Sequence, residues 1–223
     1  MQRLTSPELL DSDSGTAEEV FTSLSDLRRI NRWFGGVSTT TSMMRSVANR
    51  TGSTSLSVLE VAAGTGDVPR SVSVQLEDKG VRMRTTLLDR SPAHLPPSKN
   101  GTSAVVADAL FLPFANASFD AVSCCLFAHH LSPEELVRFV QEALRVCRVA
   151  VVINDLIRHP IHLALVYAGW PLYRSRLTQH DAPASVRAAY TVPEICELLK
   201  QTVAREVMVQ RYHLFRMGVV AWK

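Results

Sequence analysis

Two glycines, Gly64 and Gly66, follow an apolar run in residues 58–67, which read VLEVAAGTGD. Glycine lets a backbone turn sharply after a strand and lets a ligand approach the main chain closely. The apolar run also contains an acidic residue, Glu60, whose carboxylate can meet a cationic group. The pattern therefore predicts a ligand-binding turn with a carboxylate just before it.

The main alternative for this turn is the dinucleotide fingerprint G-x-G-x-x-G. Its third glycine would fall at position 69, which is Pro69. A dinucleotide also places its pyrophosphate at the N-terminus of the following helix, where the charge of Asp67 would repel it. A ligand without phosphates fits better. S-adenosyl-L-methionine has an adenosine and an amino-acid part but no phosphate, and Glu60 could meet its ammonium group directly or through water.

Two further acidic residues follow later apolar segments. Asp89 comes about 20 positions after Gly66, where a carboxylate is well placed to accept both ribose hydroxyls. Asp108 follows the next segment and can accept from the adenine amino group, while the N–H of Ala109 reaches a ring nitrogen. A single aspartate is equally well explained as a turn residue or a helix cap. Three polar groups in this order favour a cofactor site.

The elements that must position these residues alternate along the chain. Short β-rich segments occupy residues 55–63, 83–89, 103–108, 119–127, 149–155, 205–210 and 215–222. Helical spacing covers 17–34, 42–49 and the segment from Val68 to Gly80, and capping boxes begin helices at Ser132 and Thr191. Alternating strands and helices predict an α/β domain with a mainly parallel sheet. Ligands of such sheets bind outside the carboxyl ends of the strands.

These segments resemble the motifs of class I S-adenosylmethionine-dependent methyltransferases. Residues 58–67 resemble the first motif and residues 87–91 (LLDRS) the second. Residues 107–122 resemble the third and fourth, and residues 136–146 the helix before the fifth strand. The resemblance covers about residues 56–155. It is nearest to the quinone-biosynthesis C-methyltransferases, in which alanine also occurs at the position of Ala62, and more weakly to polyketide-associated enzymes.

The resemblance implies a doubly wound, mainly parallel seven-stranded sheet, the Rossmann-like methyltransferase fold, with its last strand antiparallel. It implies a helical N-terminal lid at 1–50 and a methyltransferase domain at 51–223, with a cap after the fifth strand at about 156–190. The cofactor would be S-adenosyl-L-methionine, the product S-adenosyl-L-homocysteine, and no metal would be required. The implied cofactor-binding residues are Arg32, Glu60, Ala62, Gly64, Thr65, Gly66, Asp89, Arg90, Asp108, Ala109 and Cys125.

Two histidines, His129 and His130, follow the fourth strand and precede a capped helix. Methyl transfer to a hydroxyl is helped by a base, and histidine titrates near neutral pH. One of them could be that base, with His130 slightly favoured over His129. The alternative is that one histidine packs under the helix and the other is solvated. His180, beside Asp181, is a second candidate base, although this pair could be a turn and nothing more.

The segment after the fifth strand is the expected cap. Residues 161–173 are almost entirely apolar but too short to cross a membrane. They could be core, could line an apolar acceptor pocket, or could rest on an anionic membrane surface through the flanking arginines. If they line a pocket, the candidate substrate-binding residues are His129, Asn154, Tyr167, Trp170, Tyr173 and Arg176.

Composition narrows the class of protein. The chain has 223 residues, 46% of them hydrophobic, which suits one globular domain. A net charge of +3 with scattered basic residues gives no case for nucleic acid. The four cysteines form no C-x-x-C pair, so neither zinc nor disulfides are expected. Residues 1–16 are polar, are not a signal peptide, and are expected to be flexible. We expect a cytoplasmic monomer or homodimer.

The sequence as a whole predicts a methyltransferase for a small apolar molecule. O-methylation of a phenolic, quinol or polyketide-type hydroxyl is the favoured reaction. C-methylation of a quinone precursor is the main alternative within this class. A protein that binds S-adenosylmethionine without catalysis is an alternative from another class. A dehydrogenase is disfavoured by Asp67 and Pro69.

Overall fold

A computed structural model describes residues 1–11, 14–96 and 103–223. The strands are β1 (Ser55–Val61), β2 (Arg82–Asp89), β3 (Ser103–Val106), β4 (Phe119–Cys125), β5 (Cys147–Leu156), β6 (Glu206–Tyr212) and β7 (Arg216–Trp222). The α-helices are α1 (Ala17–Trp33), α2 (Gly36–Thr51), α3 (Asp67–Glu77), α4 (Pro133–Val146), α5 (Pro160–Ala168), α6 (Arg176–Ala188) and α7 (Val192–Leu199). Short 3₁₀ turns are η1 (Ala128–His130), η2 (Trp170–Leu172) and η3 (His213–Phe215).

The seven strands form one sheet in the order β3-β2-β1-β4-β5-β7-β6. The pairs among the first five strands in this order are parallel, and β7 is antiparallel to both of its neighbours. The predicted doubly wound, mainly parallel seven-stranded sheet is therefore confirmed. The strand order reverses between β1 and β4, which is where ligands of such sheets bind.

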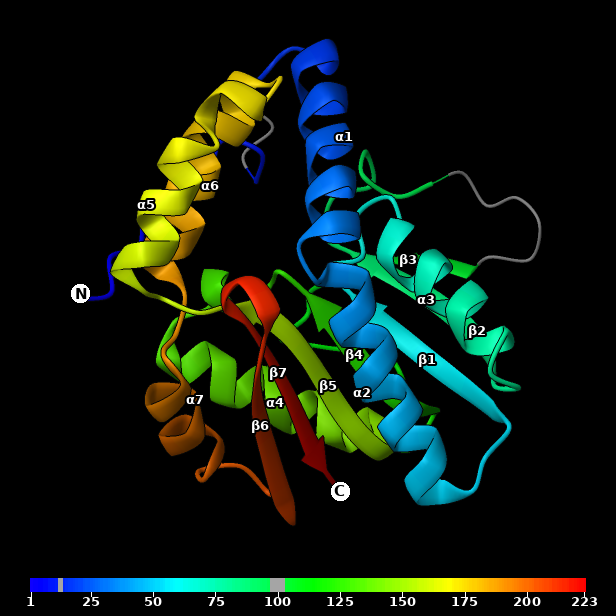
Figure 1. The fold of residues 1–223 in the computed structure, drawn as a ribbon. Helices are drawn as coiled ribbons and strands as arrows, with labels where there is room; N and C mark the ends of the chain where they lie inside the picture. Colours follow the sequence, from blue (N-terminus) through cyan, green and yellow to red (C-terminus); the bar gives the residue numbers. More distant parts are fainter. Residues whose placement is uncertain (12–13, 97–102) are drawn as a thin grey trace.

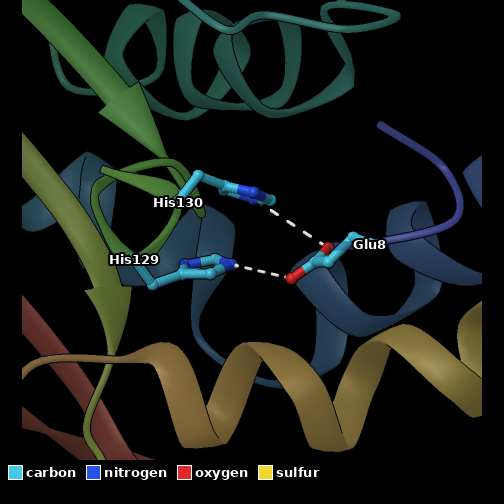
Figure 2. A group of neighbouring side chains, drawn as sticks. All are labelled: Glu8, His129 and His130. Carbon is cyan, nitrogen blue, oxygen red and sulfur yellow. Dashed lines mark ion pairs between the residues drawn. The ribbon is translucent and has the colours of Figure 1, made fainter. Parts of the chain in front are cut away.

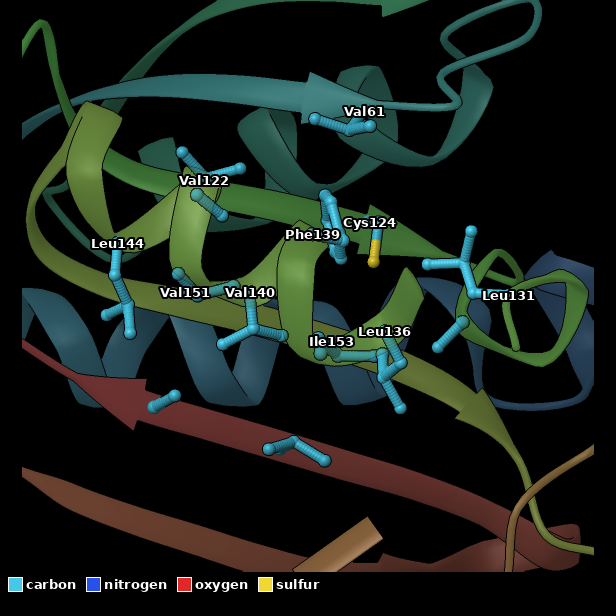
Figure 3. Close-up of a cluster of buried hydrophobic side chains, with 14 of the residues drawn as sticks. Val61, Val122, Cys124, Leu131, Leu136, Phe139, Val140, Leu144, Val151 and Ile153 are labelled. Atoms are coloured by element: carbon cyan, nitrogen blue, oxygen red, sulfur yellow. The ribbon is translucent and has the colours of Figure 1, made fainter. Parts of the chain in front are cut away.

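Helices cover both faces of the sheet because the strand residues alternate in direction. Val58 of β1 packs with the side chains of α2 and α3, whereas the next residue, Leu59, packs with those of α4. Figure 3 shows Phe139 and Leu144 of α4 against the second face. Helices α1, α5 and α6 instead rise beyond one edge of the sheet (Figure 1). The described residues include no helix long and apolar enough to span a membrane.

Helix α2 begins earlier than the sequence predicted. Residues 39–41 are three threonines, and threonine has a low helix propensity. In the structure the Thr40 hydroxyl donates to the Gly36 carbonyl at 2.8 Å and Thr41 to Val37 at 2.9 Å. These bonds to the preceding turn let threonine continue a helix. Of the two helices in the predicted N-terminal lid, α2 packs on the sheet and α1 stands away from it. The domain division at residue 50 stays a prediction.

The N-terminal segment, residues 1–11, is tied to the domain, so the expectation of flexibility was wrong for these residues. The Arg3 guanidinium donates to the carbonyl oxygens of Ala188, His129 and Leu131 at 2.6 to 3.0 Å. The N–H groups of Leu9 and Leu10 donate to the carboxylate of Asp181 at 2.8 and 3.0 Å. The partners that fix this segment lie more than 120 positions away, so local composition could not reveal them.

Candidate active site

A cavity of about 1160 Å³ lies at the carboxyl ends of the parallel strands, between the sheet edge and the helices α1, α5 and α6. Its walls come from the glycine turn, from the ends of β2, β3 and β4, from the N-terminal segment and from η1. Pockets for drug-sized ligands typically have volumes of about 300–1,000 Å³. The cavity is therefore large enough for a cofactor together with a small second molecule.

The glycine turn follows β1 at the switch point of the sheet. Ala62, Gly64 and Gly66 all have positive φ, between 50° and 70°. A Cβ on Gly66 would lie 2.7 Å from Cδ1 of Leu87, whereas a Cβ on Gly64 would meet open space. Ala62, Gly64 and Thr65 line the cavity, but Gly66 does not. Gly66 therefore shapes the turn and caps α3, which differs from its expected contact with the cofactor.

Asp89 links the turns that follow β1 and β2. Its Oδ2 accepts from the Gly64 N–H at 2.8 Å and its Oδ1 from the Ser91 N–H at 3.0 Å. The carboxylate is buried at the cavity wall and held in one orientation. The next residue, Arg90, also lines the cavity.

Asp108 and Ala109 bring a third strand end to the same cavity. Oδ1 of Asp108 accepts from the Leu110 N–H at 2.8 Å, so this aspartate also begins a turn. The structure thus places the polar groups after β1, β2 and β3 along one wall, in the order expected from the sequence.

Two further predicted residues line the inner wall at the ends of β1 and β4. Burial raises the pKa of Glu60 to about 7, so its carboxyl changes charge near neutral pH. Burial likewise raises the pKa of Cys125 to about 12, which keeps its thiol neutral. Cys125 is therefore part of the wall and has no nucleophilic character.

The first histidine after β4, His129, is buried between two carboxylates. Its Nδ1 lies 2.7 Å from Oδ1 of Asp155. Its Nε2 lies 3.5 Å from Oε1 of Glu8, an ion pair marked in Figure 2. Burial disfavours the charged imidazole, but Asp155 and Glu8 together raise the pKa of His129 to about 10. His129 is thus an imidazolium at neutral pH and cannot act as a base there.

The second histidine, His130, faces the cavity. Its Nδ1 lies 2.9 Å from Oδ2 of Asp11, and its Nε2 lies 3.9 Å from Oε2 of Glu8. The side chain is about one-fifth exposed, so a ligand can reach it. The ligand atoms of Glu8, His129 and His130 lie within 4.8 Å of one another, close enough to hold a metal ion. A metal would have to displace the proton that Asp155 and Glu8 hold on His129.

Several residues predicted for the cofactor or the base are not at the cavity. Arg32 is exposed on α1, and its guanidinium lies over the ring of Trp33, 5.7 Å from the ring centroid. His180 is 48% exposed on α6 and pairs with Asp181 at 2.8 Å. Both side chains occupy the outer faces of their helices, which sequence periodicity did not distinguish from the inner faces.

Predicted substrate residues are also distributed differently. Tyr173 lines the cavity, but Tyr167 and Trp170 stack on each other outside it, with ring centroids 5.8 Å apart. Arg176 pairs with Glu19 of α1 and does not line the cavity either. Asn154 is fully buried, and its amide donates to the Gly36 carbonyl at 2.8 Å, so it fixes the start of α2.

Sequence reasoning missed several side chains of the cavity, including three charged ones. Glu8 and Asp11 were assigned to a flexible segment, and no local pattern indicates their contacts with the histidines. Arg216 was assigned only to a closing strand, yet it lines the cavity. An arginine inside the apolar stretch FRMGVVAW was the available signal, because an unpaired charge is rarely placed in a buried strand.

Comparisons with known proteins agree with this geometry. A family model described as a methyltransferase domain matches residues 58–149. No curated protein sequence matches the chain. The solved plantazolicin methyltransferase BpumL, in complex with a monoazolic desmethylPZN analog and SAH, shares 14% identity at a TM-score of 0.72. That match covers 96% of this chain and 93% of the other.

Two further solved structures have the same core fold. A SAM-dependent methyltransferase from Aquifex aeolicus shares 16% identity at a TM-score of 0.51, over 75% of this chain and 81% of its own. The CMeT domain of the citrinin polyketide synthase shares 14% identity at a TM-score of 0.55, over 74% of this chain and 46% of its own. At such identities these structures show the fold alone. The family model over residues 58–149 and the strand-end motifs together support a class I S-adenosylmethionine-dependent methyltransferase.

Proposed function

We propose that this methyltransferase transfers a methyl group to a hydroxyl of a small apolar acceptor, of the phenolic, quinol or polyketide type. The observation that carries the proposal is the continuous cavity from the glycine turn to His130. Cofactor motifs and a candidate base that line one cavity can act on two molecules held side by side. Such alignment of donor and acceptor is the main requirement of methyl transfer.

The strand-end residues fit S-adenosylmethionine, which supplies a methyl group already activated on a sulfonium sulfur. The Asp89 carboxylate, held by two N–H groups, keeps lone pairs that can accept the ribose hydroxyls. Asp108 and the Ala109 N–H would hold the adenine, and Glu60 the ammonium group. Thr65, Arg90 and Cys125 would complete the wall.

The start of α3 supports a cofactor without phosphates. Oδ2 of Asp67 accepts from Arg28 Nε at 2.7 Å and from the Thr65 hydroxyl at 2.6 Å. A carboxylate thus already occupies the helix N-terminus where a pyrophosphate would bind.

His130 is the proposed base. A hydrogen bond from its Nδ1–H to Asp11 would keep the proton on Nδ1 and leave Nε2 free to accept the hydroxyl proton. His129 cannot share this role because it is already protonated. The structure therefore supports His130 over His180, which lies outside the cavity.

Apolar side chains of the cap support an apolar acceptor. Leu165, Val166 and Leu172 line the cavity from α5 and η2, and Tyr173 follows them. BpumL matches nearly the whole chain, and the analog bound in its structure is monoazolic, so it contains an azole ring. A flat aromatic acceptor is consistent with both observations.

The test is a panel of phenols, quinols and pyrones incubated with the protein and S-adenosylmethionine. S-adenosylhomocysteine release measures turnover, and mass spectrometry measures the product. O-methyl ethers are expected from at least one class. Products methylated only on ring carbon would instead support C-methylation of a quinone precursor.

A further inference from the structure

Arg216 is a buried arginine at the wall of the cavity. It is the first residue of β7, opposite Leu156 of β5, and only 1% of its surface is exposed. The two residues before it, Leu214 and Phe215, have φ values of 57° and 59°, a region that residues other than glycine rarely adopt. Both also line the cavity. Unusual backbone of this kind is concentrated at functional sites.

The hydrogen bonds of Arg216 leave its charge unbalanced. Its Nε donates to the Phe34 carbonyl at 2.9 Å, and its Nη2 donates to Oδ1 of Asn31 at 3.0 Å. Its Nη1 is buried and has no hydrogen-bond partner. Both acceptors are neutral, and no carboxylate in the described residues forms an ion pair with this guanidinium. A buried cation without a counter-ion is costly in free energy.

Another buried arginine, Arg158, shows how this chain normally satisfies such a group. Its guanidinium forms an ion pair with Glu194 and donates to the carbonyl oxygens of Met1 and Ala189. Arg216 is even more deeply buried than Arg158, but no such carboxylate pairs with it among the described residues. The difference is that Arg216 lines the cavity, whereas Arg158 does not.

We propose that Arg216 binds a carboxylate carried by a ligand in this cavity. A guanidinium matches a carboxylate in geometry and charge, and Nη1 supplies an unused donor. The neighbouring His162 would not compete for the anion, since burial, aided by the charge of Arg216, lowers its pKa and keeps the ring neutral.

Two ligands of the proposed reaction could carry this carboxylate, so the assignment of the ligand rests on the proposed function. One is the amino-acid end of the cofactor. The other is an acidic acceptor. In the sheet β7 lies three strands from β1, which at the usual spacing between strands is about 14 Å from the glycine turn, so Arg216 could contact a second molecule beside the cofactor. Either source would give Arg216 its counter-ion.

The experiment compares wild type with Arg216→Gln by calorimetry, and needs no methyl transfer. S-adenosylhomocysteine and 5′-methylthioadenosine, which lacks the amino-acid end, probe the first source. Benzoate and the neutral benzamide, titrated into protein saturated with S-adenosylhomocysteine, probe the second. Arg211→Gln, an exposed arginine on the adjacent β6, is the matched control for lost charge.

In Arg216→Gln we expect a loss of at least tenfold in affinity for one carboxylate ligand and no change for its neutral counterpart. Loss for S-adenosylhomocysteine identifies the cofactor as the source, and loss for benzoate identifies the acceptor. If both carboxylates bind Arg216→Gln as they bind wild type, the proposal is overturned. Should this variant not fold, Arg216→Lys keeps the charge, and it must retain a preference for carboxylate over neutral ligand. These binding results stand whether or not O-methylation is found.

Discussion

The Nδ1 atom of His129 lies 2.7 Å from Oδ1 of Asp155, and both side chains are almost completely buried. The backbone N–H of His129 also donates to the other carboxylate oxygen of Asp155, Oδ2, at 3.0 Å. This double contact joins the end of β5 to the 3₁₀ turn after β4. It fixes the backbone that carries His130, so the buried pair positions the candidate base.

The charge of His129 predicts how stability depends on pH. Its pKa is raised from 6.5 to about 10 in the folded protein, so folding favours the protonated ring. This contribution is complete below pH 6.5 and is lost as the pH rises through about 10. Denaturant unfolding at pH 6, 8 and 10 should therefore show falling stability in wild type. In His129→Gln the decline should be shallower; parallel curves for the two proteins would contradict the assignment.

Glu60 should act in the same sense as His129, lowering stability as the pH rises, but over the range from acid to neutral pH. Its pKa is raised from 4.5 to about 7, so the folded protein holds a proton that the unfolded chain releases, and stability falls as the pH rises from 4.5 through 7. Glu60→Gln removes that cost and should stabilise the protein at pH 8 by up to about 3 kcal/mol, with little effect at pH 4.5.

The same substitution should weaken cofactor binding, because the ammonium group loses its carboxylate. Calorimetry at pH 8 measures this loss, alongside unfolding of the same samples. A variant that gains stability and binds S-adenosylmethionine as tightly as wild type would remove Glu60 from the site.

Asp89→Ala should weaken binding of S-adenosylmethionine by about 1 to 3 kcal/mol, because ribose hydroxyls would lose a charged acceptor. Asp89→Asn keeps the side-chain shape and an acceptor for Gly64, so it separates lost charge from a disturbed turn. Asp78→Ala, an exposed aspartate at the end of α3, is the control. Unchanged affinity in Asp89→Ala would refute the ribose assignment.

His130→Ala should reduce turnover roughly a hundredfold and leave affinity for S-adenosylhomocysteine unchanged, as expected for loss of a general base. His180→Ala, an exposed histidine outside the cavity, serves as the comparison and should retain full turnover. The proposal fails if the two variants lose activity equally, or if His180→Ala alone is impaired.

The sequence predicted the sheet and its cofactor edge because these depend on local patterns. Short β-rich apolar segments defined the strands, and the order of strand ends predicted that Gly64, Asp89 and Asp108 line one cavity. A residue at the end of a strand is positioned by that strand alone, so its place in the site follows from local sequence.

The acceptor side could not be predicted in the same way. Glu8 and Asp11 reach the histidines through a segment held by long-range hydrogen bonds to α6 and η1. Whether Tyr167 or Tyr173 faces the cavity depends on how α5 and η2 are oriented beyond the edge of the sheet. Asn154 was expected at the acceptor because it ends a strand, but its amide is used by the first turn of α2.

The most direct test of the proposed reaction is the position of the transferred methyl group. Wild type is incubated with S-adenosylmethionine labelled with ¹³C on its methyl group and with the best acceptor from the panel, and the product is examined by NMR. The structure predicts the label on oxygen, as a methyl ether, with its formation sharply reduced in His130→Ala. A label on ring carbon or on nitrogen, formed equally by wild type and His130→Ala, would contradict O-methylation by this site.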